Sequence, residues 1–375
     1  MHGTNILAEA NRQITICNAC RYCENLCAVF PAMEQRRVFS DDSLDYLANL
    51  CHNCGACYEA CQYIPPHDFA VNVPKVLAEL RSESYARYAW PHGLAPLFRR
   101  NGLVVALTAA VAVAFFIGGF VALGDATVLF AAQTGPGAFY RLMPHEVMVL
   151  LFGGVFAFAI LALAMSVRSF WHAIGGGPLT MSDIRDAGRA AATLHYLDGG
   201  GGGCLNEEAR PDDRRFFHHC TFYGFVLCFA STSLATVLHN GFGWHAPYSW
   251  YNPVVLLGII GGLGLLIGPL GLLRAKENHD PGLSDARARG MEVGFLVMLW
   301  LTSATGLLLL VLRATPMMGV LLALHLGVVF ALFLTFPYGK FVHGFYRSTA
   351  LVRFAQEKRT PVTVSDNAES QRNRR

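Results

Sequence analysis

The hydrophobic and polar positions divide the chain into two parts near residue 90. Residues 1–90 are polar on average but include short helical patterns such as SDDSLDYLANL, where Ser40 or Asp41 would cap a helix with an apolar face. Beyond residue 100 the chain contains six long apolar runs, each near the roughly 20 residues that a helix needs to cross a bilayer. This pattern predicts an all-α protein with a polar head, residues 1–90, and a six-helix membrane domain, residues 91–343.

Most of the predicted membrane helices are joined by short polar connections. The spans lie near residues 102–123, 145–166, 217–238, 253–273, 292–312 and 317–337. Core helices of a large soluble protein are the alternative for any single run, but six runs in succession favour a bilayer. One long connection, residues 167–216, includes the helical stretch GGGPLTMSDIRDAGRAAATLHYL, so we expect a docking element there. Residues 344–375 form a polar tail, and we expect AQEKRTPVTVSDNAESQRNRR to be disordered.

The distribution of charge predicts the orientation of these helices. Charged residues make up only 15% of the chain, against about 25% in soluble proteins, which agrees with a membrane domain. Only two of the 29 Lys and Arg residues, Arg141 and Arg313, fall in the connections 124–144, 239–252 and 313–316. By the positive-inside rule these connections lie outside, so we expect an inner-membrane protein with both termini cytoplasmic. The net charge of +3 is too small to indicate nucleic acid.

Eight cysteines of the head form two runs with the same spacing. CNACRYCENLC, residues 17–27, and CHNCGACYEAC, residues 51–61, both place four cysteines three, three and four residues apart. A C-x-x-C-x-x-C run wraps three thiolates around one face of an iron–sulfur cluster, and a distant cysteine supplies the fourth ligand. Zinc sites, the alternative, usually combine two C-x-x-C pairs. The N-terminal MHGTNILAEANRQ lacks the apolar region of a secretory signal, so we expect reduced cysteines and two [4Fe–4S] clusters.

The fourth cysteine of each run is expected to serve the other cluster, as in two-cluster ferredoxins. Few β-branched residues flank the runs, which favours a helical ferredoxin-type domain over a β-sheet one. One cluster then takes Cys17, Cys20, Cys23 and Cys61, and the other takes Cys51, Cys54, Cys57 and Cys27.

Histidines near the ends of two predicted membrane helices are candidate haem ligands. In the last span, LHLGVVFALFLTFPYGKFVHGF, His325 and His343 lie 18 residues apart. On one helix this is about five turns, so both rings would point the same way, about 27 Å apart. The third span carries His218 and His219 at its inner end and His239 at its outer end. Neutral imidazole is a common axial ligand of haem iron, so we predict one or two b-type haems.

The depths of these histidines predict two pairs. His343 would share an inner haem with His218 or His219, and His325 would share an outer haem with His239. On the third span, His218 and His239 fall within about 60° of one face, whereas His219 and His239 fall nearer opposite faces. Interfacial histidines with no ligand are the alternative at each position.

No motif in the sequence indicates chemistry on a carbon substrate. We find no dinucleotide-binding fingerprint, no P-loop and no Ser–His–Asp arrangement suited to hydrolysis. GIIGGLGLLIG is glycine-rich but lies within a span, where small residues favour close helix packing. The acceptor that we expect is membrane quinone. His145, in PHEVMVLL, would be a quinone-site residue or a substitute for the outer haem ligand.

The cysteine-rich head, the six spans and two long segments together resemble a known family. HHCTFYGFVLCFASTSLATVLH and HLGVVFALFLTFPYGKFVHGFYRSTAL are similar to the tricarballylate-utilisation protein B family, also called the citrate-utilisation protein B family. The last span also resembles the haem-bearing membrane subunit of respiratory nitrate reductases, where two histidines on one late helix ligate two stacked haems. In that subunit the opposing histidines lie closer together than His218 and His239 do here.

The family resemblance implies electron transfer from a flavoprotein. It implies a cytoplasmic partner, tricarballylate dehydrogenase, whose reduced FAD is reoxidised through the clusters and haem to quinone. A related module serves a flavoprotein in cobalamin synthesis, so the substrate of the partner stays open. Two alternatives also stay open: a membrane anchor that only localises a partner, and a heterodisulfide-reductase-like subunit that reduces a substrate at the head.

Overall fold

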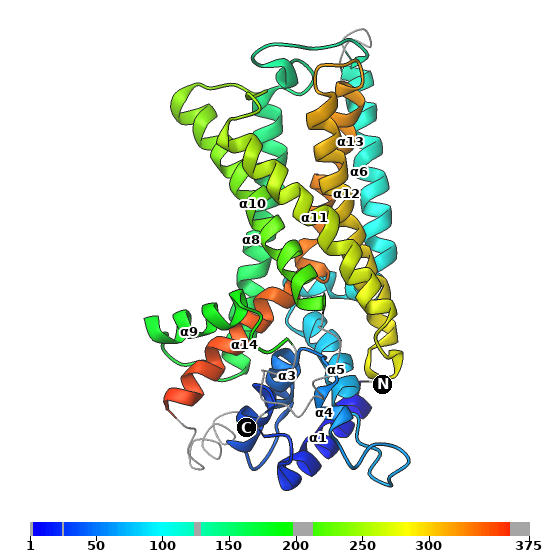
Figure 1. The fold of residues 1–375 in the computed structure, drawn as a ribbon, viewed down its shortest axis with the longest axis vertical. Coiled ribbons are helices and arrows are strands. Elements are labelled where there is room, and N and C mark those ends of the chain that lie inside the picture. Colours follow the sequence, from blue (N-terminus) through cyan, green and yellow to red (C-terminus); the bar gives the residue numbers. More distant parts are fainter. Residues whose placement is uncertain (1–2, 25, 124–128, 198–212, 361–375) are drawn as a thin grey trace.

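The computed structural model describes residues 3–24, 26–123, 129–197 and 213–360, most of which are helical (Figure 1). No strand occurs among these residues, which confirms the all-α prediction. Part of the long connection, residues 198–212, and the tail from residue 361 lie outside the described residues. The helices are α1 (Gly3–Cys20), α2 (Val29–Glu34), α3 (Asp41–Leu50), α4 (Ala56–Glu59), α5 (Val73–Arg87), α6 (Asn101–Leu123), α8 (His145–Ala173), α9 (Met181–Ala192), α10 (Asp213–Phe242), α11 (Pro253–Glu277), α12 (Arg289–Leu312), α13 (Met318–Thr335) and α14 (Val342–Arg359).

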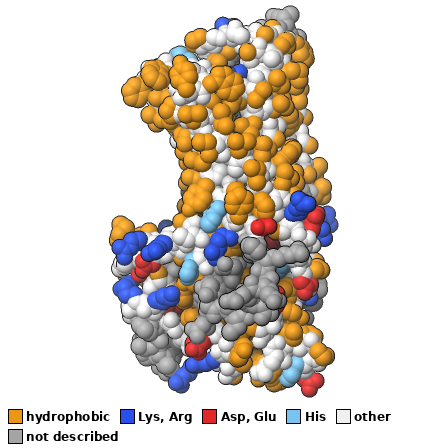
Figure 2. Space-filling view, in the orientation of Figure 1, with side chains coloured by type: hydrophobic (Ala, Val, Ile, Leu, Met, Phe, Trp, Pro, Cys, Tyr) orange, Lys and Arg blue, Asp and Glu red, His pale blue; other side chains and the backbone are white. Residues whose placement is uncertain are grey.

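Six of these helices are long and apolar enough to cross a membrane, as the sequence predicts. They are α6, α8, α10, α11, α12 and α13, and they form an elongated bundle above the head in Figure 1. On the face shown in Figure 2, hydrophobic side chains dominate the bundle, while most charged side chains gather around the head. These features are compatible with a multi-pass membrane protein.

Close packing of α10 on α11 depends on glycines of the GIIGGLGLLIG segment. A Cβ atom built at Gly261 would lie 2.8 Å from the carbonyl oxygen of Gly224, and one at Gly268 would lie 2.3 Å from Thr221 Oγ1. Only glycine allows the two backbones to approach this closely, which agrees with the packing role predicted for the segment. α11 packs next on α12, and α13 packs on both α12 and α6.

The head is a small helical domain joined to the base of the bundle. Ser40 caps α3 by accepting a hydrogen bond from the Ser43 N–H over 3.3 Å. α3 and α1 both pack on α5. The core of the head continues into the rest of the chain, since Tyr85 of α5 stacks on Tyr346 of α14 with ring centroids 5.5 Å apart. The head and the bundle base therefore share one hydrophobic core.

The prediction that His325 and His343 lie on one straight helix is wrong. α13 ends at Thr335, a single 3-10 turn follows at Phe336–Tyr338, and α14 begins at Val342. Pro337 lacks the N–H that would continue the helix, which explains the break. The two imidazoles are therefore positioned by different helices, and the five-turn argument does not apply to them.

The prediction of disorder from residue 355 is also wrong as far as Arg359. α14 continues to this residue, and Glu357 near its end is buried. The helix predicted within the long connection is confirmed as α9, which starts with a capping box between Thr180 and Asp183. α9 packs against α14, where Arg359 pairs with Asp183 over 3.1 Å.

Candidate metal centres

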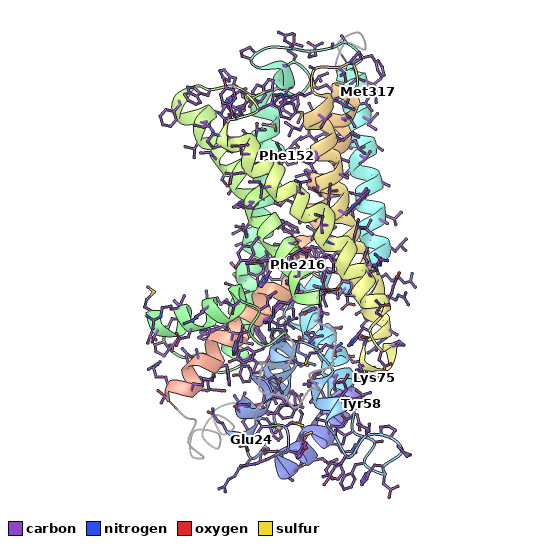
Figure 3. All side chains as sticks on the ribbon, in the orientation of Figure 1. Glu24, Tyr58, Lys75, Phe152, Phe216 and Met317 are labelled. Carbon is purple, nitrogen blue, oxygen red and sulfur yellow. The ribbon has the colours of Figure 1, made fainter. Side chains whose placement is uncertain are left out.

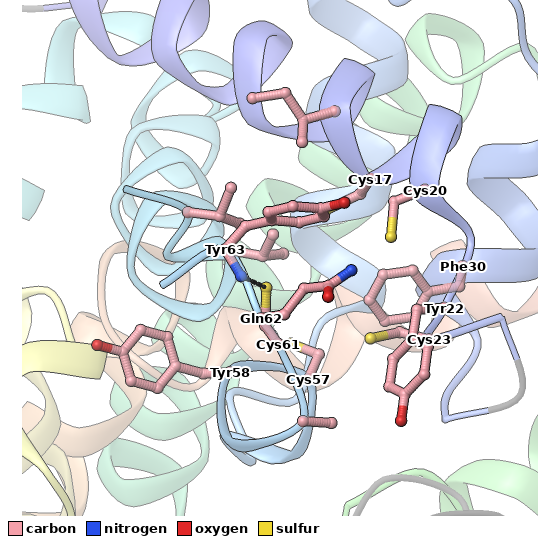
Figure 4. Close-up of a pocket in the computed structure, with 14 residues that line it drawn as sticks. Cys17, Cys20, Tyr22, Cys23, Phe30, Cys57, Tyr58, Cys61, Gln62 and Tyr63 are labelled. Carbon is pink, nitrogen blue, oxygen red and sulfur yellow. Dashed lines mark hydrogen bonds between the residues drawn. The ribbon is translucent and has the colours of Figure 1, made fainter. Parts of the chain in front are cut away.

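One cavity of the head, of about 170 Å³, is surrounded by thiols from both cysteine runs. Cys20, Cys23 and Cys61 direct their sulfur atoms toward this space in Figure 4. Cys17, at the end of α1, also lines the cavity. The fourth cysteine of the second run thus joins three cysteines of the first. We call Cys17, Cys20, Cys23 and Cys61 the first thiol set.

A second, smaller cavity is surrounded by the remaining cysteines. Cys27, the last cysteine of the first run, lines it together with Cys51 and Cys54. Cys57 borders both cavities, but its strongest electrostatic neighbour is Cys27. The structure therefore brings together the residues of the crossed assignment. We call Cys51, Cys54, Cys57 and Cys27 the second thiol set.

The two runs repeat part of their backbone conformation as well as their spacing. The residue after the second cysteine is left-handed in both, with φ of 57° at Arg21 and 88° at Gly55. Amide groups also approach the sulfur atoms: the Asn53 N–H donates to Cys51 Sγ over 3.4 Å, and the Tyr63 N–H donates to Cys61 Sγ over 3.3 Å. Such contacts stabilise a thiolate, which is the form that binds iron.

Burial makes Cys17 and Cys23 of the first thiol set poor acids when no metal neutralises them. Burial and the neighbouring thiols, Cys61 first, raise the pKa of Cys17 to about 12 and that of Cys23 to about 11. Four thiolates gathered around one partly buried cavity need a compensating positive charge, and the iron atoms of a cluster would supply it. In the described part of the chain, no three His, Cys, Asp or Glu side chains converge on one ion. A [4Fe–4S] cube presents a separate iron to each of four thiolates, and each thiol set supplies four cysteines.

The two thiol sets differ in their exposure. In the first set Cys20 is exposed, and the neighbouring Tyr22 has 73% of its surface accessible. In the second set Cys51 is buried, and it follows α3 directly. Figure 3 shows Glu24 of the first run low in the head, while Phe216 of α10 lies where the bundle meets the head.

At this junction the structure brings His218 of α10 close to His343 of α14. Their ring centroids lie 6.2 Å apart at an interplanar angle of 76°. His343 Nδ1 lies 2.5 Å from the carbonyl oxygen of Lys340, so Nδ1 carries the proton and Nε2 is available as a ligand. His218 Nδ1 is buried without a hydrogen-bond partner among the described residues. His219 Nε2 is likewise buried without a hydrogen-bond partner among the described residues, but the His219 ring contacts Tyr223, so the ring contact with His343 favours His218.

The predicted outer pair is not in contact. His325 Nδ1 lies 3.0 Å from Thr305 Oγ1 of α12. The same ring packs so closely on Gly306 that a Cβ atom there would lie 2.9 Å from His325 Cε1. Among the described residues, no ring contact joins His325 to His239, which lies at the end of α10. His325 lies within α13 and packs on α12, whereas His239 lies near the end of α10 and contacts His145 and Tyr140, so the two rings have different neighbours.

His239 instead belongs to a cluster at the end of the bundle opposite the head. Its ring stacks on that of His145 with centroids 3.9 Å apart, and its Nδ1 lies 3.2 Å from both Tyr140 Oη and His245 Nδ1. We call His145, His239, His245 and Tyr140 the distal cluster. Sequence reasoning missed His245 and Tyr140 because neither lies in a predicted span, although both occur in connections rich in aromatic residues.

Comparison with known proteins identifies two family models along the chain. The model for citrate utilization protein B matches residues 96–363, and the model for the Fer4-like domain of citrate utilization protein B matches residues 10–87. The curated citrate utilization protein B of Escherichia coli is 49% identical over 357 residues, covering 94% of this chain and 93% of that protein. No solved structure matches the chain.

Proposed function

The chain belongs to the citrate utilization protein B family, and from this premise we propose that it is a membrane electron-transfer protein. It would accept electrons from the reduced FAD of a dehydrogenase, by resemblance tricarballylate dehydrogenase, and pass them to membrane quinone. The observation that carries this proposal is the position of the thiols: one set opens at the surface of the head, and the other lies near the junction histidines.

The two thiol sets would each hold one [4Fe–4S] cluster, which supplies one-electron redox chemistry when bound. The exposed position of Cys20 and Tyr22 suits the entry of electrons, because a partner can approach this part of the head. The positive-inside distribution of Lys and Arg supports a cytoplasmic position for the head and both termini, where such a dehydrogenase partner would bind.

His218 and His343 would hold a b-type haem at the junction. Their donor chemistry fits, since one Nε2 is available and the other ring has an unsatisfied buried nitrogen. A further observation supports a bound group beside α10. Only 11% of the apolar stretch of α10 is buried within the protein, the lowest share among the six helices, so most of this helix is free to contact a prosthetic group or lipid.

The distal cluster supports a site for quinone at the opposite end of the bundle. Quinone reduction consumes two electrons and two protons, and imidazole and phenol groups can donate or relay protons. His239 contacts His145, His245 and Tyr140, so a chain of titratable groups surrounds this position. His145 is then a quinone-site residue, in agreement with one of the two roles predicted for it.

The test of the proposal uses the purified full-length protein. After reduction with dithionite, addition of a soluble quinone analogue is expected to reoxidise the iron–sulfur and haem absorbance. His343→Ala and His218→Ala should each remove the reduced haem α-band, whereas the neighbouring His219→Ala should retain it and serves as the matched control. Full reduction without reoxidation by quinone would indicate an anchor rather than an electron carrier.

A further inference from the structure

Three arginines from different helices converge on the backbone of the second cysteine run. Arg81 Nη1 of α5 and Arg347 Nη2 of α14 both donate to the carbonyl oxygen of Cys51, over 2.5 and 2.7 Å. Arg214 of α10 donates to the carbonyl oxygens of the next two residues over 3.0 and 3.3 Å. One side chain from the head and two from the bundle base therefore bind the same segment, residues 51–53.

These hydrogen bonds leave the positive charge of the guanidinium groups in place. A carbonyl group is neutral, so it orients an arginine without cancelling its charge. Arg347 lies near enough to Cys51, and Arg214 near enough to Cys54, for electrostatic interaction with the thiols. A fourth cation nearby, Lys340, is paired with Glu292 over 2.7 Å. Residues 51–53 of the second cysteine run are thus in contact with three guanidinium groups, two of them from helices outside the head.

Two of the arginines are also linked to the junction histidines by helix geometry. Arg214 precedes His218 by four residues on α10, and Arg347 follows His343 by four residues on α14. Residues four apart lie on the same face of a helix, one turn from each other. Each of these two helices therefore presents an imidazole at the junction and, one turn away, an arginine to the second cysteine run.

We propose that Arg81, Arg214 and Arg347 are positioning residues that raise the reduction potential of the cluster held by the second thiol set and fix this cluster beside the junction histidines. The inference rests on the proposed function, because it requires the clusters. Positive charge favours the form with one more electron, and net charge and solvent exposure are main determinants of cluster potential. Cys20 of the first thiol set is exposed to water, which screens charge, so a neighbouring cation changes the potential of a cluster there by less.

The consequence is a direction for electron transfer within the head. One electron passes from the group held by the first thiol set to the group held by the second. The former is oxidised and the latter is reduced, and no bond forms or breaks. A higher potential at the second set favours this direction, toward the bundle and away from the exposed surface of the head.

The test is a redox titration of both clusters by electron paramagnetic resonance in the purified full-length protein. Arg347→Gln should shift the reduction equilibrium of one cluster at least tenfold toward the oxidised form, which is about 59 mV for one electron. The affected signal should be the one that Cys27→Ala removes. Arg347→Lys keeps the charge and should restore most of the potential. Arg214→Gln provides a second variant if Arg347→Gln does not fold.

Arg185→Gln is the control, because it removes one exposed positive charge that pairs with Asp186 and does not bind the second cysteine run. Its two cluster potentials should stay within threefold of the parent equilibrium. Clusters that are present in the arginine variants with unshifted potentials would overturn this inference and leave the proposed function standing. Parent protein that binds no cluster at all would overturn both.

Discussion

A buried carboxylate on α14 is expected to hold the head against the bundle base. Glu357 accepts a hydrogen bond from Tyr46 over 2.9 Å and forms ion pairs with Arg36 and Arg353. Glu357 and Arg36 are both buried, and 321 residues separate them in the sequence. We therefore predict that Glu357→Gln, which keeps the size of the side chain but removes its charge, strongly destabilises the docking of the head on α14.

The expected magnitude follows from the burial of the pair. Removal of one partner from a buried ion pair costs about 3–5 kcal/mol, because the other charge is left uncompensated. Since about 1.4 kcal/mol corresponds to a factor of ten, the head of the variant should open from α14 more often, by about two to three and a half powers of ten. Hydrogen exchange of amides in α2, α3 and α14 measures this opening directly.

The exposed pair between Glu9 and Arg12, 2.6 Å apart, gives a matched control. Glu9→Gln should change the opening free energy by at most about 1 kcal/mol, since water screens exposed ion pairs. The double variant Arg36→Met, Glu357→Gln should recover part of the loss, because it removes the uncompensated guanidinium. Exchange in Glu357→Gln that is as slow as in Glu9→Gln would refute the reasoning.

Three further predictions concern the head and the bundle. Burial, only partly offset by Arg87 and Tyr88, raises the pKa of Asp45 from 3.8 to about 6. The protonated Asp45 side chain therefore contributes to stability below pH 3.8, and this contribution is lost as the pH rises through 6. Between pH 4 and pH 7, the free energy of unfolding of Asp45→Asn should therefore rise by on the order of 2–3 kcal/mol relative to that of the parent protein. Thermal unfolding scans measure this difference, and a stability that varies with pH in the same way in both proteins would exclude this role. Gly261→Leu should separate α10 from α11 and lower the melting temperature in detergent, whereas Gly118→Leu, where no atom lies within 4 Å of the added Cβ, should not. Cys61→Ala and Cys27→Ala should each remove one of two cluster signals, a different one in each variant; loss of the same signal in both would argue against the crossed assignment.

The features predicted correctly from the sequence depend on local patterns. Six apolar runs are sufficient to predict six long helices, because length and hydropathy alone determine whether a helix can span a bilayer. The crossed assignment of the cysteines stays a prediction; the two cavities support it, because each is lined by the fourth cysteine of the other run. Helix caps such as Ser40 are equally local.

The features that were predicted wrongly depend on chain breaks and on distant partners. Pro337 and Gly339 are local signals for the end of α13, but apolar residues continue past them, so the hydrophobic pattern alone predicts one longer helix. The extent of α14 had no comparable signal. Its last turns are polar, and Glu357 becomes a core residue only through Arg36 and Tyr46, which lie more than 300 residues earlier.

The two cysteine runs illustrate how far a sequence repeat determines function. Their spacing is equal, and in both runs the residue after the second cysteine, Arg21 or Gly55, has a left-handed backbone conformation. Their surroundings differ because Arg214 and Arg347 reach only the second run, and both belong to helices that begin more than 150 residues beyond it. Since cluster potential depends on charge and solvent as well as on ligands, identical runs placed in unlike surroundings can differ in potential. Under the proposal above, the two cysteine runs therefore favour electron transfer in one direction only once the bundle has packed against the head.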